Sequence, residues 1–256
     1  MKKHFFFTFT TITVLFMTSF VSYKAAYKPI INSMESLIDA MHKRYKDKAA
    51  KNVTFTQYNT HYQADTVSGT SIWYEAIQYP TNFRIDFGAI KEGNAVIFAY
   101  DSVFNFKDGK NTRKLPFKNN LILLAGGMNA MPKEKVLAEL KAASYDISKF
   151  REDTYNNKAV YVIGAASGDF TSPQFWIDKK HLYLVRTFEK MPNGDVREAR
   201  FSKHTKAGKG WIETEVLFLV NGKKTQLEQY KDLKANVAFD ARLFDAAYFG
   251  KVHWKE

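Results

Sequence analysis

The hydrophobic pattern of the chain changes from a helical period to a strand period near residue 50. Residues 31–50 are predicted to form an amphipathic helix, because their apolar side chains recur three or four positions apart and make one stripe. Asn32 and Glu35 have the spacing of a capping box at its start. The stripe consists of Met34, Leu37, Ile38, Met41 and Tyr45.

From residue 53 onward, apolar and polar side chains alternate, which is the period of a half-buried β-strand. Asn193-Gly194 and Asn221-Gly222 are the turn sequences of tight hairpins. Residues 238–249 are interpreted as a last turn and edge. The segments expected as strands are 53–58, 70–78, 83–87, 95–100, 103–107, a short strand after 108–109, 146–154, 159–165, 174–178, 182–189, 196–202, 211–220 and 223–230.

An apolar run at 121–128 interrupts this series of strands and predicts a short helix that ends at the pair Gly126-Gly127. A second helix follows Met131-Pro132. The fold class expected is mainly β with helices (α+β): a curved antiparallel sheet, or incomplete β-barrel, of about ten or eleven strands. The N-terminal helix and the inserted helices would cover it, the latter as a lid. No long linker or repeat divides residues 27–256, so we expect a single domain there.

The first 26 residues have the features of an export signal. A short basic start is followed by an uncharged stretch at 5–22, and small residues at Ser22, Ala25 and Ala26 offer cleavage points. We therefore expect residues 1–26 to be a cleaved signal peptide and the protein to be periplasmic. The alternative is a retained membrane anchor at 5–22, because this stretch approaches the roughly 18–20 residues that span a bilayer.

Composition excludes several kinds of chemistry. The chain has no cysteine, so it can form neither a disulfide nor a thiolate metal site. Its six histidines do not have metal-ligand spacing, and no phosphate-binding loop, dinucleotide fingerprint or nucleophile elbow is present. We expect no enzyme activity, no cofactor and no metal. The net charge of +12 favours anionic surfaces, but the basic residues are scattered and nucleic-acid binding is not expected.

Large apolar side chains on the predicted strands and on the inserted segment could line one concave face. Such a set can either fill a core or surround a cavity that holds acyl chains, and periodicity does not separate these two alternatives. The candidate cavity residues are Trp73, Phe83, Ile85, Phe87, Phe98, Phe104, Phe106, Leu121, Leu124, Met128, Phe175, Leu184, Phe188, Trp211 and Phe218.

The order of elements resembles the LolA/LolB superfamily of outer-membrane lipoprotein carriers over nearly all of the mature chain. The segments that carry the resemblance are VTFTQY, IWYEAIQYPTNFRIDFG, VIFAYDSVFNFKDGKNTRK, the inserted helical run, QFWIDKKHLYLVRTFEKMPNGD and NVAFDARLFDAAYF. One departure concerns the lid. These carriers commonly have an arginine before the strand-breaking proline, where it helps to latch the lid, but this chain has Tyr79 at that position. The latch role cannot be transferred to the nearby Arg84.

The resemblance implies a monomeric periplasmic carrier that binds the acyl chains of a lipoprotein or another lipid and moves them towards the outer membrane. An inner-membrane donor and an outer-membrane acceptor would be its partners. The alternative is a periplasmic sensor or scaffold of the same fold, with a filled core and a protein partner. A third class, an enzyme, would show convergent polar groups with perturbed pKa values in a cleft.

Overall fold

A computed structural model describes residues 1 and 30–255 of the chain. The expected signal peptide, apart from Met1, and the alternative anchor at 5–22 lie outside the described residues. Among the residues described, no helix is long and apolar enough to cross a bilayer.

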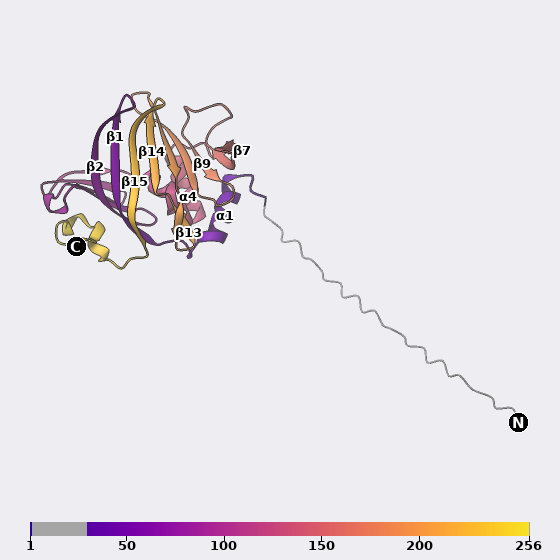
Figure 1. Cartoon of the computed structure of the whole chain (residues 1–256), viewed down its shortest axis with the longest axis horizontal. Helices are drawn as coiled ribbons and strands as arrows, with labels where there is room; N and C mark the ends of the chain where they lie inside the picture. Colours follow the sequence, from indigo (N-terminus) through magenta and orange to yellow (C-terminus); the bar gives the residue numbers. More distant parts are fainter. Residues whose placement is uncertain (2–29, 256) are drawn as a thin grey trace.

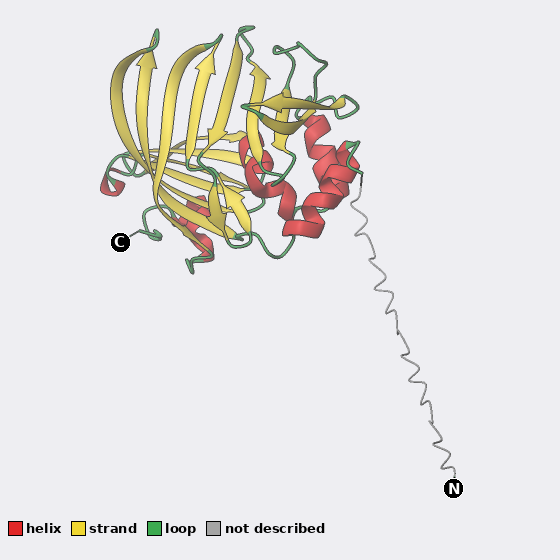
Figure 2. Cartoon of the chain, turned by 45° about the vertical axis from the view of Figure 1, so that its right-hand side comes forward, coloured by secondary structure: helices red, strands yellow, loops and turns green. Residues whose placement is uncertain are grey.

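Thirteen antiparallel strands form one strongly curved sheet, which wraps partly around the helices (Figures 1 and 2). The strand order runs β6-β5-β4-β3-β2-β1-β15-β14-β11-β10-β9-β8-β7, so β6 and β7 are free edges and the barrel is incomplete, as predicted. The strands are β1 (Asn52–Gln63), β2 (Thr66–Gln78), β3 (Asn82–Phe87), β4 (Ala95–Ala99), β5 (Ser102–Lys107), β6 (Lys110–Pro116), β7 (Phe150–Tyr155), β8 (Lys158–Ile163), β9 (Gln174–Asp178), β10 (Leu184–Lys190), β11 (Val196–Ser202), β14 (Glu215–Val220) and β15 (Lys223–Ala235).

Several of the predicted strands have different limits in the structure: β1 continues to Gln63 rather than ending at 58, β7 begins at Phe150 rather than at 146, and β15 continues to Ala235 rather than ending at 230. β2 begins at Thr66 rather than at residue 70, because a two-residue turn at Ala64 and Asp65 pairs it with β1 up to Gln63. Both turn residues have positive φ, which a tight hairpin requires but which alanine does not signal. The segment 211–220 is also broken: a separate hairpin of β12 (Thr205–Ala207) and β13 (Gly210–Ile212) precedes β14.

The N-terminal helix α1 (Met34–Tyr45) is shorter than the predicted span, and its cap is one residue later. Ser33 is the N-cap and Ser36 completes the capping box, in place of Asn32 and Glu35. The predicted stripe, however, is buried, and the helix packs against α3 and α4 of the inserted segment. The helix therefore closes one end of the concave face, at the right of Figure 1.

The inserted segment consists of α2 (Asn120–Ile122), the π-turn η2 (Leu123–Gly127), α3 (Met128–Ala130) and α4 (Lys133–Ala142). The helix is interrupted at the glycine pair, as predicted, because Gly126 has non-helical backbone dihedrals (φ 174°, ψ −23°), and a further short helix, α3, follows this kink. The glycines also permit close approach. A Cβ at Gly126 would lie 2.6 Å from the Tyr79 ring, and one at Gly127 would lie 2.7 Å from the Pro80 carbonyl oxygen. Tyr79 therefore supports the inserted helices directly.

The convex face of β3 to β5 is covered by the C-terminal segment, which contains η3 (Ala241–Phe244) and η4 (Ala246–Tyr248) and was predicted as an edge. Arg84 anchors this segment: it is 2% exposed, forms two 2.9 Å hydrogen bonds to Asp86 and donates to the Val252 carbonyl. Its side chain lies on the face opposite the inserted helices, so it does not form a latch with them. A short 3-10 turn, η1 (Ile90–Glu92), joins β3 to β4.

Candidate functional site

A cavity of about 180 Å³ lies between the concave face of the sheet and the inserted helices. Its walls come from β1, β2, β3, β4, β11, β13, β14 and β15, and α2 and η2 cover it. The apolar part of the lining consists of Phe55, Trp73, Ile77, Phe83, Ile85, Phe98, Leu121, Ile122, Ala125, Phe201, Ile212, Val216, Phe218 and the ring of Tyr230.

Part of the predicted set lines this cavity: Trp73, Phe83, Ile85, Phe98, Leu121 and Phe218. Phe87 packs edge-on against Trp73, with ring centroids 5.0 Å apart. A second part belongs to the buried core beneath α1: Leu124, Met128, Phe175 and Leu184. Trp211 is half-buried against the same core, beside Tyr183.

The remaining predicted residues lie on the convex face. Val103 pairs with the cavity residue Phe98, and since successive strand residues point to opposite faces, Phe104 and Phe106 point away from the cavity. Phe106 stacks on Phe249 of the C-terminal segment, 3.8 Å between centroids. Phe188 belongs to a convex-face cluster around Trp176. The sequence shows alternation within each strand, but only strand pairing fixes which residues share a face.

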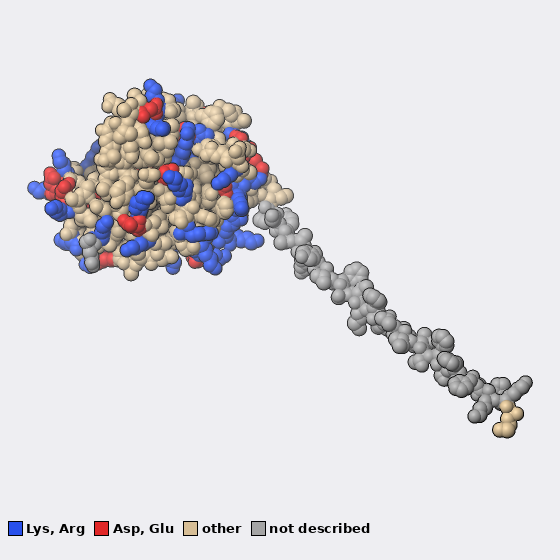
Figure 3. Space-filling view, in the orientation of Figure 1, with Lys and Arg blue, Asp and Glu red and all other residues tan. Residues whose placement is uncertain are grey.

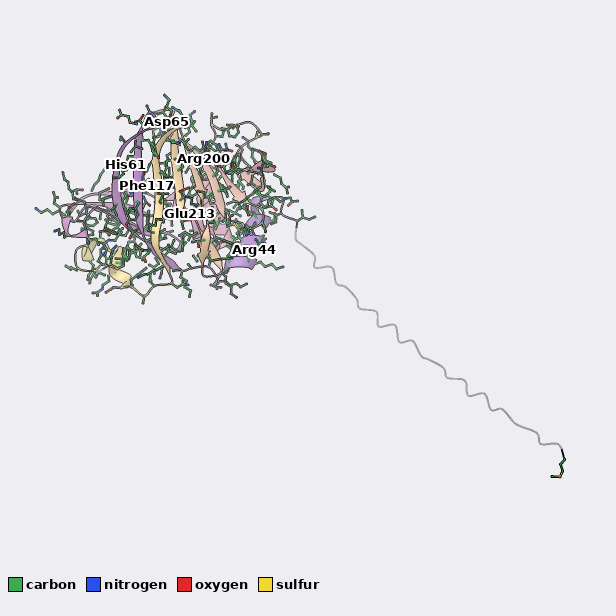
Figure 4. All side chains as sticks on the ribbon, viewed as in Figure 1. Arg44, His61, Asp65, Phe117, Arg200 and Glu213 are labelled. Carbon is green, nitrogen blue, oxygen red and sulfur yellow. The ribbon has the colours of Figure 1, made fainter. Side chains whose placement is uncertain are left out.

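The polar residues of the cavity were not predicted. Gln57, Glu75, Asn119, Glu213 and Glu228 line it together with the apolar side chains. The sequence does indicate one of them. Glu75 is two residues from both Trp73 and Ile77, so its side chain is expected on the same face of the strand as theirs. Glu213 lies in the break between β13 and β14, near the centre of the molecule in Figure 4.

Glu228 is held by neighbours on its own strand. The Tyr230 hydroxyl donates to one carboxyl oxygen at 3.0 Å, and the Gln226 amide donates to the other at 2.8 Å. Burial nevertheless raises the pKa of Glu228 to about 7.

The carboxyl groups of Glu75 and Glu213 have fewer hydrogen-bond partners than that of Glu228. Glu75 is 3% exposed, and its carboxyl group has no hydrogen bond or ion pair with any described residue. Burial, followed by the charges of Glu228 and Glu213, raises the pKa of Glu75 well above its ordinary value. Burial likewise raises the pKa of Glu213 to about 8. The cavity thus has three carboxyl groups that resist ionisation, and its lining includes no lysine, arginine or histidine.

Within residues 30–255, the glutamates do not form a metal site: no three His, Cys, Asp or Glu side chains come close enough to share an ion. The outer surface has the opposite charge. Lysine and arginine outnumber acidic residues on the face shown in Figure 3. They gather towards the end of α1, where Lys43 and Arg44 occupy the last turn (Figure 4).

Comparison with solved structures shows that the chain has the fold of the LolA superfamily, which confirms the resemblance seen in the sequence. It is similar to an outer membrane lipoprotein-sorting protein domain from Vibrio parahaemolyticus (TM-score 0.55, 13% identity), over 84% of this chain and 97% of that one. A DUF1329 family protein from Desulfovibrio piger has a TM-score of 0.57 and 12% identity, over 84% and 97% of the two chains.

A LolA superfamily protein from Nitrosomonas europaea is similar over 86% of this chain and its own full length, with a TM-score of 0.51 and 10% identity. No protein-family model and no curated protein sequence matches the chain. Identities of this size establish the fold alone.

Proposed function

We propose that the protein is a periplasmic carrier that binds the acyl chains of a lipoprotein or another lipid in the cavity beneath α2 and η2. The observation that carries this proposal is an apolar cavity at the centre of the concave face of a LolA-like fold. Apolar burial contributes about 25 cal/mol per Å² removed from water, so a hydrocarbon chain is a suitable occupant. We propose further that residues 1–26 direct export and are removed, and that the carrier moves its cargo towards the outer membrane.

The volume of the cavity limits how much of a cargo molecule it can hold. An engineered apolar cavity of about 150 Å³ holds one benzene molecule, and pockets for larger ligands measure about 300–1,000 Å³. At about 180 Å³, the cavity accommodates the end of one chain. For whole acyl chains to enter, the inserted helices must therefore move away from the sheet. These helices contribute Leu121, Ile122 and Ala125 to the cavity lining.

The carrier explains the site better than the two alternatives. A sensor or scaffold needs no cavity. An enzyme would use carboxyl groups whose pKa values are pushed apart, one protonated and one ionised. Here burial raises the pKa of Glu75, Glu213 and Glu228 alike, and no serine, lysine or histidine lines the cavity.

The proposal predicts that Ile85→Asp lowers the affinity for a palmitoylated peptide at least tenfold, because a carboxylate in the cavity wall would have to be desolvated beside hydrocarbon. Binding is measured by calorimetry on the purified mature chain. Ile72→Asp is the matched control, since Ile72 is on the neighbouring strand and is 40% exposed. Equal binding by the two variants would contradict the proposed site.

A further inference from the structure

The cavity has an electrostatic character opposite to that of the protein surface. The chain carries a net charge of +12, yet the ionisable groups that line the cavity are three glutamates and one tyrosine. A carboxylate or phosphate brought into this space would face acidic groups at short range and would find no cation among the described lining residues. An anionic group that accompanies hydrocarbon would therefore enter the cavity without a countercharge.

The Glu75 carboxyl group is the place in the cavity where a polar group of a ligand would find a hydrogen-bond partner. Its side chain lies between the apolar side chains of Trp73 and Ile77 on the cavity wall, opposite Phe55 on β1 and Ile85 on β3. Nearly all buried polar groups in proteins have a hydrogen-bond partner. The Glu75 carboxyl has none among the described residues and faces a space large enough for one. Glu228, in contrast, already accepts two hydrogen bonds.

We propose that the cavity selects amphiphiles whose polar group next to the hydrocarbon carries a positively charged nitrogen, and that Glu75 is the partner of that nitrogen. An ammonium group donates hydrogen bonds to a carboxylate, and such charge-assisted bonds are stronger than neutral ones. Binding of the ammonium group would favour loss of the Glu75 proton to solvent, and it would supply the resulting carboxylate with a donor and a countercharge that the described lining residues do not provide. The proposal rests on the proposed function, since it names the polar group that enters the same cavity.

Calorimetric titration at pH 8 with decylamine, decanol and decanoate tests the selectivity. The three probes have the same hydrocarbon, and at this pH the amine is protonated and the carboxylate ionised. The expected dissociation constant for decylamine is at least tenfold lower than for decanol, with decanoate the weakest ligand. Decanoate or decanol binding as tightly as decylamine would overturn the proposal.

The variants Glu75→Gln and Glu213→Gln test which carboxyl group causes the preference for decylamine over decanol. Thermal unfolding establishes that each variant is folded. Glu75→Gln should bind decylamine and decanol with similar affinity, and Glu213→Gln should weaken the preference. Glu152→Gln, whose side chain is 57% exposed on β7, should keep it. A preference that persists in both cavity variants would refute the role of Glu75.

The two proposals fail in different ways. If decanol binds and Ile85→Asp abolishes that binding, but decylamine has no advantage, then the carrier function stands and the selectivity does not. If none of the three decyl probes binds, both proposals are wrong.

Discussion

Arg84→Met is expected to lower the free energy of unfolding by about 3–5 kcal/mol, because it leaves the buried Asp86 carboxylate without its bidentate partner. The two side chains are each 2% exposed and form a bidentate pair. Burial alone would raise the pKa of Asp86, but hydrogen bonds from His253 and Arg84 hold it below its usual range. Arg84 also lies over the Phe249 ring, so the substitution removes a contact of the C-terminal segment as well.

Urea denaturation of the purified protein measures this loss. Arg151→Met is the control, because its partner Asp153 is 38% exposed and such pairs contribute about 0–1 kcal/mol. The double variant Arg84→Met/Asp86→Leu should be more stable than Arg84→Met, since an apolar pair leaves no buried charge. A loss below about 1 kcal/mol in the single variant would show that the pair is not buried as described.

The second large effect is a loss of stability with rising pH. Glu213 has a folded-state pKa of about 8 and an ordinary value of 4.5, so between these values the folded protein keeps a proton that the unfolded chain has released. Stability then falls as the pH rises from about 4.5 to about 8 and is level above that range. Each pKa unit corresponds to about 1.4 kcal/mol, which gives a decrease on the order of 3–5 kcal/mol from Glu213.

Glu213→Gln should remove this part of the pH dependence and make the protein more stable than the wild type at pH 9. The ionisable groups that interact electrostatically with Glu213 are Glu75, Glu228, Tyr79 and Tyr230. The raised pKa values of Glu75 and Glu228 also make stability fall as the pH rises. Free energies of unfolding at pH 5, 7 and 9 provide the comparison. Identical slopes for the wild type and Glu213→Gln would contradict the burial of this carboxyl group.

The sequence predicts the fold well because strand and helix periods are local. The stripe of α1 needs no knowledge of distant residues and is buried as expected. On β3 the alternation correctly predicts a strand, but Ile85 and Phe87 are only half-buried, and Arg84 and Asp86 are buried because the C-terminal segment covers their face. Boundaries fail where the backbone conformation is not signalled by residue type. The positive φ of Ala64 in the turn between β1 and β2 is such a position.

The site is less predictable because a cavity is a property of several strands together. Phe98 and Phe104 look equivalent in the sequence, but the pairing of β4 with β5 places them on opposite faces. Leu124 and Phe98 are both apolar, yet Phe98 lines the cavity and Leu124 packs into the core beneath α1. Glu75 and Glu228 are separated by most of the chain, so no local motif indicates that they share a cavity.

Native mass spectrometry tests the central claim most directly. The protein is expressed with its own signal, purified from the periplasm, and measured before and after extraction with organic solvent. The account predicts a bound amphiphile that disappears on extraction and is depleted in Ile85→Asp but retained in Ile72→Asp. A mass equal to that of the bare mature chain, together with no uptake of added lipid or palmitoylated peptide, would contradict it.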